Sequence, residues 1–307
     1  MSRSIQILTG RDKHYLIYFV NRIKNRRKDM QIGIRFHDTK ELPFEERLQE
    51  IKRQGFSCTH IALSKVPGFT ADTDALTPGY AMYMRDAFRR ADLDVAVLGC
   101  YLNLATPDEA ALKANQDKYM AHIRFASLMG AGMVGTETGA PNVNYSYDKE
   151  ACHSQEALDT FITNLKPVVS YAEKMGVIVA IEPVYRHIVW NPKRAREVLD
   201  RIESPNLQII FDPVNLLWTD NYEQRYEVFE EAMDLLKREI CMIHLKDCVL
   251  EENGVKSMGC GLGEMDYTSI VKFAHEYKPF IHATLEDTKP DNAVFARETI
   301  QKIEASL

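Results

Sequence analysis

From about residue 31 onward, short apolar runs alternate along the chain with longer segments in which apolar residues recur every three or four positions. The run 177–181 (VIVAI) is continuous and mostly β-branched, which is typical of a strand buried on both faces of a sheet. Seven further runs have a similar character. The pattern therefore predicts eight strands, at residues 31–36, 58–64, 94–101, 132–137, 177–182, 207–212, 241–246 and 282–287.

The segments between these runs predict amphipathic helices. One of them places a set of apolar residues on a single helical face, namely Leu158, Phe161, Ile162, Leu165, Val169 and Ala172. Gly176 stands where this helix should end, and Gly55 and Gly130 mark similar turns from helix to strand. Eight alternating units predict an α/β fold, a single (β/α)₈ barrel over residues 31–307. A doubly wound sheet is the competing fold, but no GxGxxG follows the first strand.

Residues 1–30 precede the predicted barrel and are expected to form an N-terminal helical extension. Within it, residues 13–29 combine an apolar patch with a basic end. This pattern predicts a helix that packs on the floor of the barrel or takes part in a subunit contact of a homo-oligomer. A membrane-surface or nucleic-acid role is the weaker interpretation, because one short basic run is common on a solvated face.

The composition narrows the classes of partner. The chain has 307 residues, of which 45% are hydrophobic, so one large domain can bury a sizeable core. A net charge of −6 and a pI of about 5.9 argue against nucleic acid bound through a basic surface. No apolar run approaches the ~20 residues that span a bilayer, so no membrane partner is expected. Six cysteines without a CxxC pair, and no secretory leader, predict reduced thiols in the cytoplasm.

Polar residues of the metal-ligand type recur at the ends of the fifth to eighth predicted strands: Glu182, Asp212, His244 and Glu286. In a parallel barrel these ends meet on one rim, which is where active sites are built. Three carboxylates so close together would repel one another and raise one another's pKa values. A divalent cation removes this repulsion, and three oxygen donors with one imidazole favour Mn²⁺, with Mg²⁺, Co²⁺, Fe²⁺ or Zn²⁺ as alternatives.

The motifs AIEP, IIFDPVN, IHLKD and TLED, with GCGLGEMDY after the seventh strand, resemble those of a known family. They are similar to the sugar isomerase/epimerase branch of the xylose-isomerase-like (AP-endonuclease-2-type) TIM barrels, which includes tagatose/psicose 3-epimerases and inosose isomerases and dehydratases. The resemblance implies that the four strand-end residues bind one metal ion and that Glu182 and Glu286 also act as acid and base. It implies an isomerase or epimerase of a small sugar, polyol-ketone or related hydroxy-carbonyl compound that works through an enediolate.

Other activities use the same rim. A metal-dependent dehydratase shares the first proton-abstraction step and is the nearest alternative. An endonuclease-IV-like nuclease needs further histidines, but strand three offers only Cys100, Tyr101 and Asn103. A non-catalytic binding barrel would not need two opposed glutamates. Asn215 and Leu250 stand where the epimerases usually carry histidine and arginine, so a substrate other than a typical ketohexose is expected.

Further residues near the strand ends are candidates for binding a small carbohydrate-like substrate: His187, Asn215, Lys246, Glu137, His60 and Trp190. Lys246 follows His244 by two positions, so strand alternation points both side chains inward. The alternatives are an ion pair for Glu137 and Lys246, a solvent-exposed loop for His187, a hydrogen-bonded core position for His60, and packing for Trp190. His37 and Asp38 follow the first strand and are expected to close the opposite side of the rim.

Overall fold

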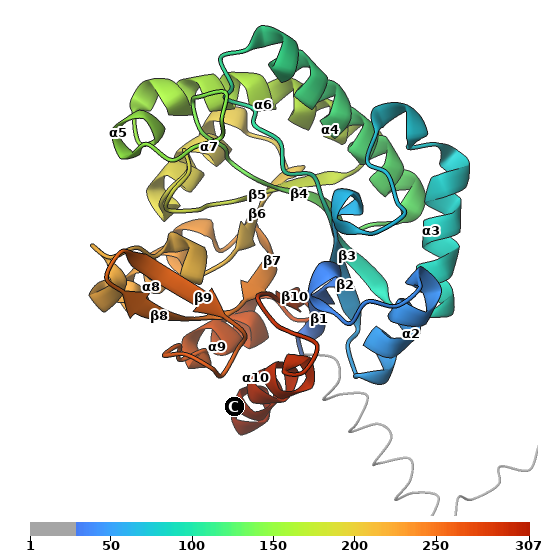
Figure 1. Cartoon of the computed structure of the whole chain (residues 1–307). Helices are drawn as coiled ribbons and strands as arrows, with labels where there is room; N and C mark the ends of the chain where they lie inside the picture. Colours follow the sequence, from blue (N-terminus) through green and yellow to red (C-terminus); the bar gives the residue numbers. More distant parts are fainter. Residues whose placement is uncertain (1–28) are drawn as a thin grey trace, which may run out of the picture.

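The computed structural model describes residues 29–307, and these follow the alternation of strands and helices that the hydrophobic pattern predicts (Figure 1). Eight parallel strands close into a barrel, which confirms the predicted fold. The helix predicted at 13–29 lies outside the described residues apart from Asp29, so the N-terminal extension stays a prediction. The barrel strands are β1 (Gln31–Arg35), β2 (Cys58–Ile61), β3 (Asp94–Gly99), β4 (Met133–Glu137), β5 (Ile178–Glu182), β6 (Leu207–Phe211), β7 (Ile240–Leu245) and β10 (His282–Leu285).

Helices surround the barrel on its outside (Figure 1). The apolar face predicted for α6 (Gln155–Met175) is buried, and Gly176 ends that helix in the left-handed conformation at φ 64°. Gly130 ends α4 (Glu109–Met129) in the same way, at φ 78°, as the sequence predicts. The helices are α2 (Phe44–Arg53), α3 (Pro78–Arg90), α4 (Glu109–Met129), α5 (Lys149–Cys152), α6 (Gln155–Met175), α7 (Pro192–Ile202), α8 (Arg225–Leu236), α9 (Thr268–Tyr277) and α10 (Ala293–Ser306).

The inside of the barrel is filled by a small apolar cluster that is separate from the core between strands and helices. Gly135 makes this filling tight, because a Cβ there would lie 2.6 Å from Val97 Cγ1 and 2.9 Å from Ile210 Cδ1. The barrel is therefore packed below its mouth, and the buried ligand-type side chains gather at the carboxyl ends of the strands. The buried members of the cluster are Cys58, Ala96, Val97, Met133, Ala180, Ile210 and Met242.

A two-stranded antiparallel hairpin follows β7 and is absent from the sequence prediction. It consists of β8 (Asp247–Glu251) and β9 (Gly254–Met258) and lies outside the barrel sheet (Figure 1). The buried carboxylate of Asp247 accepts backbone hydrogen bonds from Gly261 and Met265, each 2.9 Å long. These bonds fix the loop after the hairpin next to the barrel. Within residues 29–307, none of the helices combines the length and apolar character needed to cross a membrane.

Candidate metal centre

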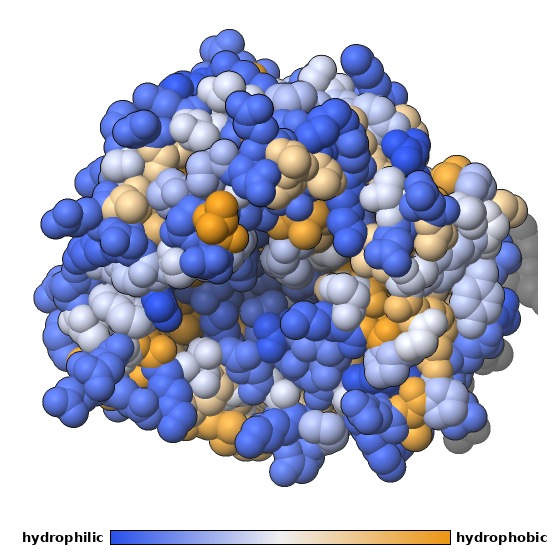
Figure 2. Space-filling model, turned by 45° about the horizontal axis from the view of Figure 1, so that its top comes forward, coloured by the Kyte–Doolittle hydropathy of each residue, from blue (hydrophilic) through white to orange (hydrophobic). Residues whose placement is uncertain are grey.

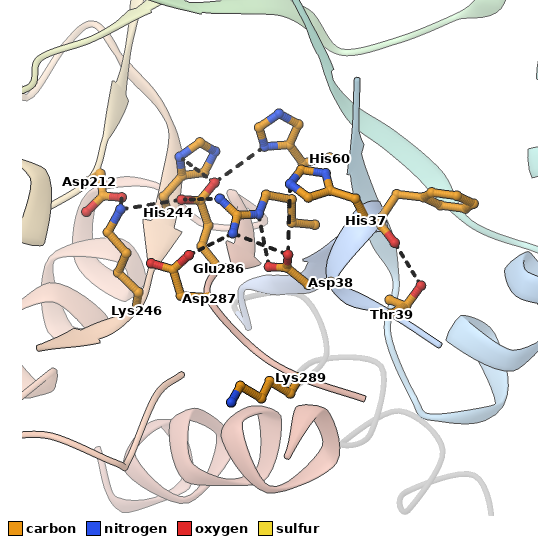
Figure 3. Close-up of polar contacts among 12 residues, drawn as sticks. His37, Asp38, Thr39, His60, Asp212, His244, Lys246, Glu286, Asp287 and Lys289 are labelled. Carbon is orange, nitrogen blue, oxygen red and sulfur yellow. Dashed lines mark hydrogen bonds and ion pairs between the residues drawn. The ribbon is translucent and has the colours of Figure 1, made fainter. Parts of the chain in front are cut away.

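The four strand-end residues lie together at the mouth of the barrel. Glu182 is the last residue of β5, Asp212 follows β6, His244 lies on β7 and Glu286 follows β10. All four are at most 4% exposed. The His244 Nδ1 atom lies 3.2 Å from Glu182 Oε2 and 3.3 Å from Glu286 Oε1 (Figure 3 shows the Glu286 side of this group). The imidazole therefore stands between the two glutamates, as the order of the strands around the barrel requires.

The local sequence explains why these side chains reach the mouth. β5 is apolar from Ile178 to Ile181 and ends at Glu182, and β6 ends in the apolar run 209–211 directly before Asp212. Pro183 and Pro213 follow Glu182 and Asp212, and a proline has no N–H with which to extend the ladder of a central strand. The strands therefore stop at the carboxylates, and the side chains lie above the apolar plug of the barrel.

Lys246 and Asn215 link the carboxylates to one another. The Lys246 Nζ atom lies 2.8 Å from Asp212 Oδ2 and 3.5 Å from Glu286 Oε2, and it donates a hydrogen bond of 2.8 Å to Asn215 Oδ1. Asn215 Nδ2 in turn donates to Glu182 Oε1 at 2.5 Å. His244 and Lys246 are both buried at the mouth, which confirms the inward direction that strand alternation predicts for them.

Arg35 is a member of the site that the sequence analysis missed. It is the last residue of β1, and its Nη1 atom lies 3.4 Å from Glu286 Oε2. Its guanidinium also binds Asp38 through Nε at 2.9 Å and Asp287 through Nη2 at 2.7 Å (Figure 3 shows both partners). His37 and Asp38 lie in the same part of the rim, on the side of β1. The sequence contained a signal for Arg35, because it stands at the end of the first strand. The same position identified the candidate ligands on four other strands.

Burial and neighbouring charges set the ionisation of the carboxyl groups. Burial and the Glu286 carboxylate raise the pKa of Glu182 to about 8. Burial, offset in part by the Lys246 ammonium, raises the pKa of Asp212 to about 6. Burial alone would raise the pKa of Glu286 as well, but His244 and Lys246 outweigh it and hold that pKa well below its ordinary value. Burial lowers the pKa of His244, and Lys246 and Arg35 are the permanent positive charges beside Glu286.

These residues fit a divalent cation. One ligand atom each from Glu182, Asp212 and His244 lie within 4.8 Å of one another. Among the described residues neither ring nitrogen of the fully buried His244 has a hydrogen-bond partner, and a neutral imidazole is a common metal ligand. When all are ionised, Glu182, Asp212 and Glu286 carry three negative charges. Lys246 offsets one of them, and the charge of Arg35 is shared between Glu286 and the neighbouring Asp38 and Asp287. Negative charge remains in excess, and a divalent ion would reduce it.

Two other predicted residues meet on the adjacent part of the rim. Glu137 ends β4 and is paired in register with Glu182. Its Oε2 atom lies 3.7 Å from His187 Nδ1 and accepts a hydrogen bond of 3.5 Å from the Tyr145 hydroxyl. Burial raises the pKa of Glu137 and lowers the pKa of His187 to about 4. His187 is thus largely enclosed, and its role in substrate binding stays a prediction.

The remaining predicted residues occupy different surroundings. His60 on β2 is fully buried, with Nδ1 3.6 Å from Glu286 Oε1. Trp190 packs on His153, with the ring centroids 4.5 Å apart and the ring planes 16° apart, so its ring is engaged in packing. Leu250 lies on β8 of the hairpin and is 41% exposed.

The surface is hollowed near the middle of the face in Figure 2, and the visible floor of this hollow is mainly hydrophilic. A separate cavity of about 610 Å³ lies at the amino-terminal ends of the strands, where Met30, Phe56 and Gln301 contribute to its lining. Since the ligand-type residues stand at the carboxyl ends, this cavity belongs to the opposite end of the barrel and has no part in the site.

Comparisons with known proteins agree on the fold. A family model described as a xylose isomerase-like TIM barrel matches residues 45–305. Curated protein sequences give no significant match. Among solved structures, the 3-keto-D-glucoside 4-epimerase YcjR from E. coli, in its apo form, is 15% identical. It aligns with a TM-score of 0.70 over 89% of this chain and 100% of that chain.

Two further structures are similar over nearly their whole length. The probable 3-DHS dehydratase AsbF of petrobactin synthesis, from Bacillus anthracis, is 14% identical with a TM-score of 0.65, covering 89% of this chain and 97% of that chain. The IOLI protein, solved with a bound zinc atom, is 16% identical with a TM-score of 0.65, covering 90% of this chain and 97% of that chain. Identities this low show a common fold and leave the activity open.

Proposed function

This chain belongs to the xylose isomerase-like TIM barrel family, and from this premise we propose that it is a divalent-metal-dependent isomerase or epimerase. Its substrate would be a small sugar, polyol-ketone or related hydroxy-carbonyl compound. The family match and the presence of an epimerase among proteins of similar fold support the general class. The location in the cytoplasm stays a prediction from the sequence.

One observation carries the proposal. Glu182, Asp212, His244 and Glu286 come from four neighbouring barrel strands and are buried together, and His244 has no hydrogen-bond partner among residues 29–307. An unpartnered buried imidazole beside three carboxylates is costly unless a cation joins them. We propose that these four residues hold one metal ion. Mn²⁺ is the favoured ion, and the zinc bound to IOLI supports a metal in this fold without fixing which one.

The chemistry follows from the arrangement of the two glutamates. When bound, the metal supplies positive charge that stabilises the oxygens of a hydroxy-carbonyl substrate as the proton on the neighbouring carbon is removed. Glu182 and Glu286 lie on either side of His244, so their carboxyl groups can reach a small substrate from two sides. One carboxylate takes up the proton, and in an epimerisation the other returns a proton to the opposite face. Lys246 orients Asp212 and keeps Glu286 ionised.

A dehydratase is the second candidate, and the AsbF structure of similar fold favours keeping it. Removal of the same proton followed by loss of a β-hydroxyl gives an unsaturated product. Burial raises the pKa of Glu137, which lies 3.7 Å from His187 on the adjacent rim, so we propose that the Glu137 carboxyl group would supply a proton to such a leaving group. A nuclease is less well supported, because the end of strand three offers Cys100, Tyr101 and Asn103 in place of a further histidine, and Asn215 likewise supplies no imidazole.

Two measurements test the proposal. Elemental analysis of the protein after incubation with Mn²⁺ should give one ion per chain, and none bound would overturn the metal site. NMR analysis of products from a panel of ketoses, inososes and keto-acids separates the two reactions. Isomerisation or epimerisation retains all hydroxyl groups, whereas dehydration removes one and releases water.

A further inference from the structure

His60 stands directly behind the proposed metal ligands. Its ring stacks on that of His244, with centroids 5.1 Å apart and planes 15° apart, and its Nδ1 atom lies 3.6 Å from Glu286 Oε1. His60 is 1% exposed. Two overlapping groups of ligand-type atoms exist as a result: His244 with Glu182 and Asp212, and His244 with His60 and Glu286. His60 can therefore act in one of two ways, either as a metal ligand or as a support for the ligand Glu286.

The other ring nitrogen of His60 is already occupied. The Tyr101 hydroxyl lies 2.6 Å from His60 Nε2. Glu286 is an acceptor, because the cations Arg35 and Lys246 both contact its Oε2 atom. The hydrogen of the imidazole is therefore best placed on Nδ1, facing Glu286, and the Nε2 lone pair accepts the hydrogen bond from Tyr101.

The backbone of β3 makes room for this pair. A Cβ on Gly99 would lie 2.7 Å from the Tyr101 ring and 3.0 Å from His60 Nε2. Any larger residue at position 99 would press the two side chains apart. On β2, a register shift between Thr59 and His60 brings His60 to this position against β3. Sequence and backbone both accommodate the contact between Tyr101 and His60.

We propose that Tyr101 and His60 form a positioning pair for Glu286, and that His60 is not itself a metal ligand. Tyr101 fixes the tautomer of His60, and His60 directs its Nδ1–H at the Glu286 carboxylate. The distance of 3.6 Å exceeds that of a hydrogen bond, and such contacts commonly shorten when the site is loaded. The consequence is one metal ion per chain. The statement about metal binding rests on the proposed function. The hydrogen bond between Tyr101 and His60 does not depend on it.

The first test reads the tautomer in the metal-free protein. The side chains of ¹⁵N-labelled histidine are observed by NMR, and the His60 signals are identified by their loss in His60→Gln. We expect the Nδ1–H form in the wild type and a marked shift of the Nε2 signal in Tyr101→Phe. Tyr222→Phe is the matched control, because it removes the hydroxyl of another buried tyrosine, which donates to Glu264 in a different loop. An Nε2–H form, or no response to Tyr101→Phe, overturns the pair.

The second test distinguishes support from ligation by titrating Mn²⁺ into His60→Asn and His60→Gln. In His60→Asn the side-chain amide takes the place of Nδ1, so a donor toward Glu286 is kept. In His60→Gln the amide takes the place of Nε2, so this donor is lost. We expect one ion per chain throughout, near-normal affinity in His60→Asn, and affinity weaker by about 10- to 100-fold in His60→Gln. Equal losses in the two variants, or two ions in the wild type and one in both variants, would overturn the proposal. A wild type that binds no Mn²⁺ refutes the metal site, and the tautomer experiment then still decides the pair.

Discussion

Replacing Lys246 with methionine removes the one permanent positive charge that contacts two of the proposed metal ligands. The ammonium lies 2.8 Å from Asp212 Oδ2 and 3.5 Å from Glu286 Oε2. Methionine keeps nearly the same length and volume, so the change is one of charge and hydrogen bonding. Glu286 retains Arg35 at 3.4 Å, and the loss falls mainly on Asp212, which keeps the backbone amide of Asn215 at 3.1 Å.

The expected destabilisation follows from these contacts. Removing one partner of a buried ion pair costs about 3–5 kcal/mol, because the other charge is left uncompensated. Asp212 limits the loss by taking up a proton, since burial already raises its pKa to about 6. We therefore expect about 3 kcal/mol at pH 7.5 in the metal-free protein. At about 2 °C per kcal/mol for a domain of this size, the Tm should fall by about 6 °C. At pH 5, Asp212 is protonated in both proteins and the difference should shrink.

The assay is thermal unfolding with a chelator and with excess Mn²⁺, at pH 5 and pH 7.5. Lys289→Met is the matched control, because it makes the same charge change at an exposed lysine nearby (Figure 3). The metal should stabilise Lys246→Met more than the wild type, since it then balances more negative charge. A Tm at pH 7.5 equal to that of the control, or the loss of any stabilisation by Mn²⁺, would refute this account of the charges.

Three further predictions concern the same site. His244→Ala should weaken Mn²⁺ binding at least about 100-fold in a calorimetric titration, because it removes a ligand and leaves the carboxylates facing one another; unchanged affinity would contradict the ligand assignment. In chelator, the stability of the wild type relative to Glu182→Gln should fall as pH rises from about 5 to 8, because folded Glu182, with its pKa raised to about 8, keeps a proton that the unfolded chain releases near 4.5; a difference that grows over this range would reverse the sign. Asn215 and Leu250 should make the wild type a poor ketohexose 3-epimerase, and Asn215→His alone should not restore it; efficient ketohexose turnover by the unmodified protein would show that these positions do not set the substrate.

The hydrophobic pattern predicts the barrel because each strand is buried on both faces and has to be apolar along its length. The same logic predicts the site, since the first polar residue after such a run, as at Glu182 or Asp212, must lie at the mouth. Gly176 and Gly130 mark helix ends because the left-handed conformation favours glycine. These features depend on local sequence and the parallel order of the strands.

Features that depend on distant parts of the chain were not predicted. Arg35 reaches Glu286 and Asp287 only because the first and last barrel strands are neighbours after closure. The pairing of His60 with Tyr101 depends on a register shift in β2 that no sequence period records. The hairpin of β8 and β9 is half-buried or exposed except at Asp247 and Cys248 and therefore lacks an apolar run, although Asn253 and Gly254 near its turn were a local signal for it.

The most direct test of the central claim is turnover of a hydroxy-carbonyl substrate in heavy water. With Mn²⁺ present, the product should carry deuterium on the carbon next to the carbonyl, and chelation should stop labelling. Glu182→Gln and Glu286→Gln should each abolish turnover, while one of them still exchanges the substrate proton and thereby identifies the base. Product that stays free of solvent deuterium over many turnovers, or labelling that survives both substitutions, would contradict proton transfer by these two glutamates.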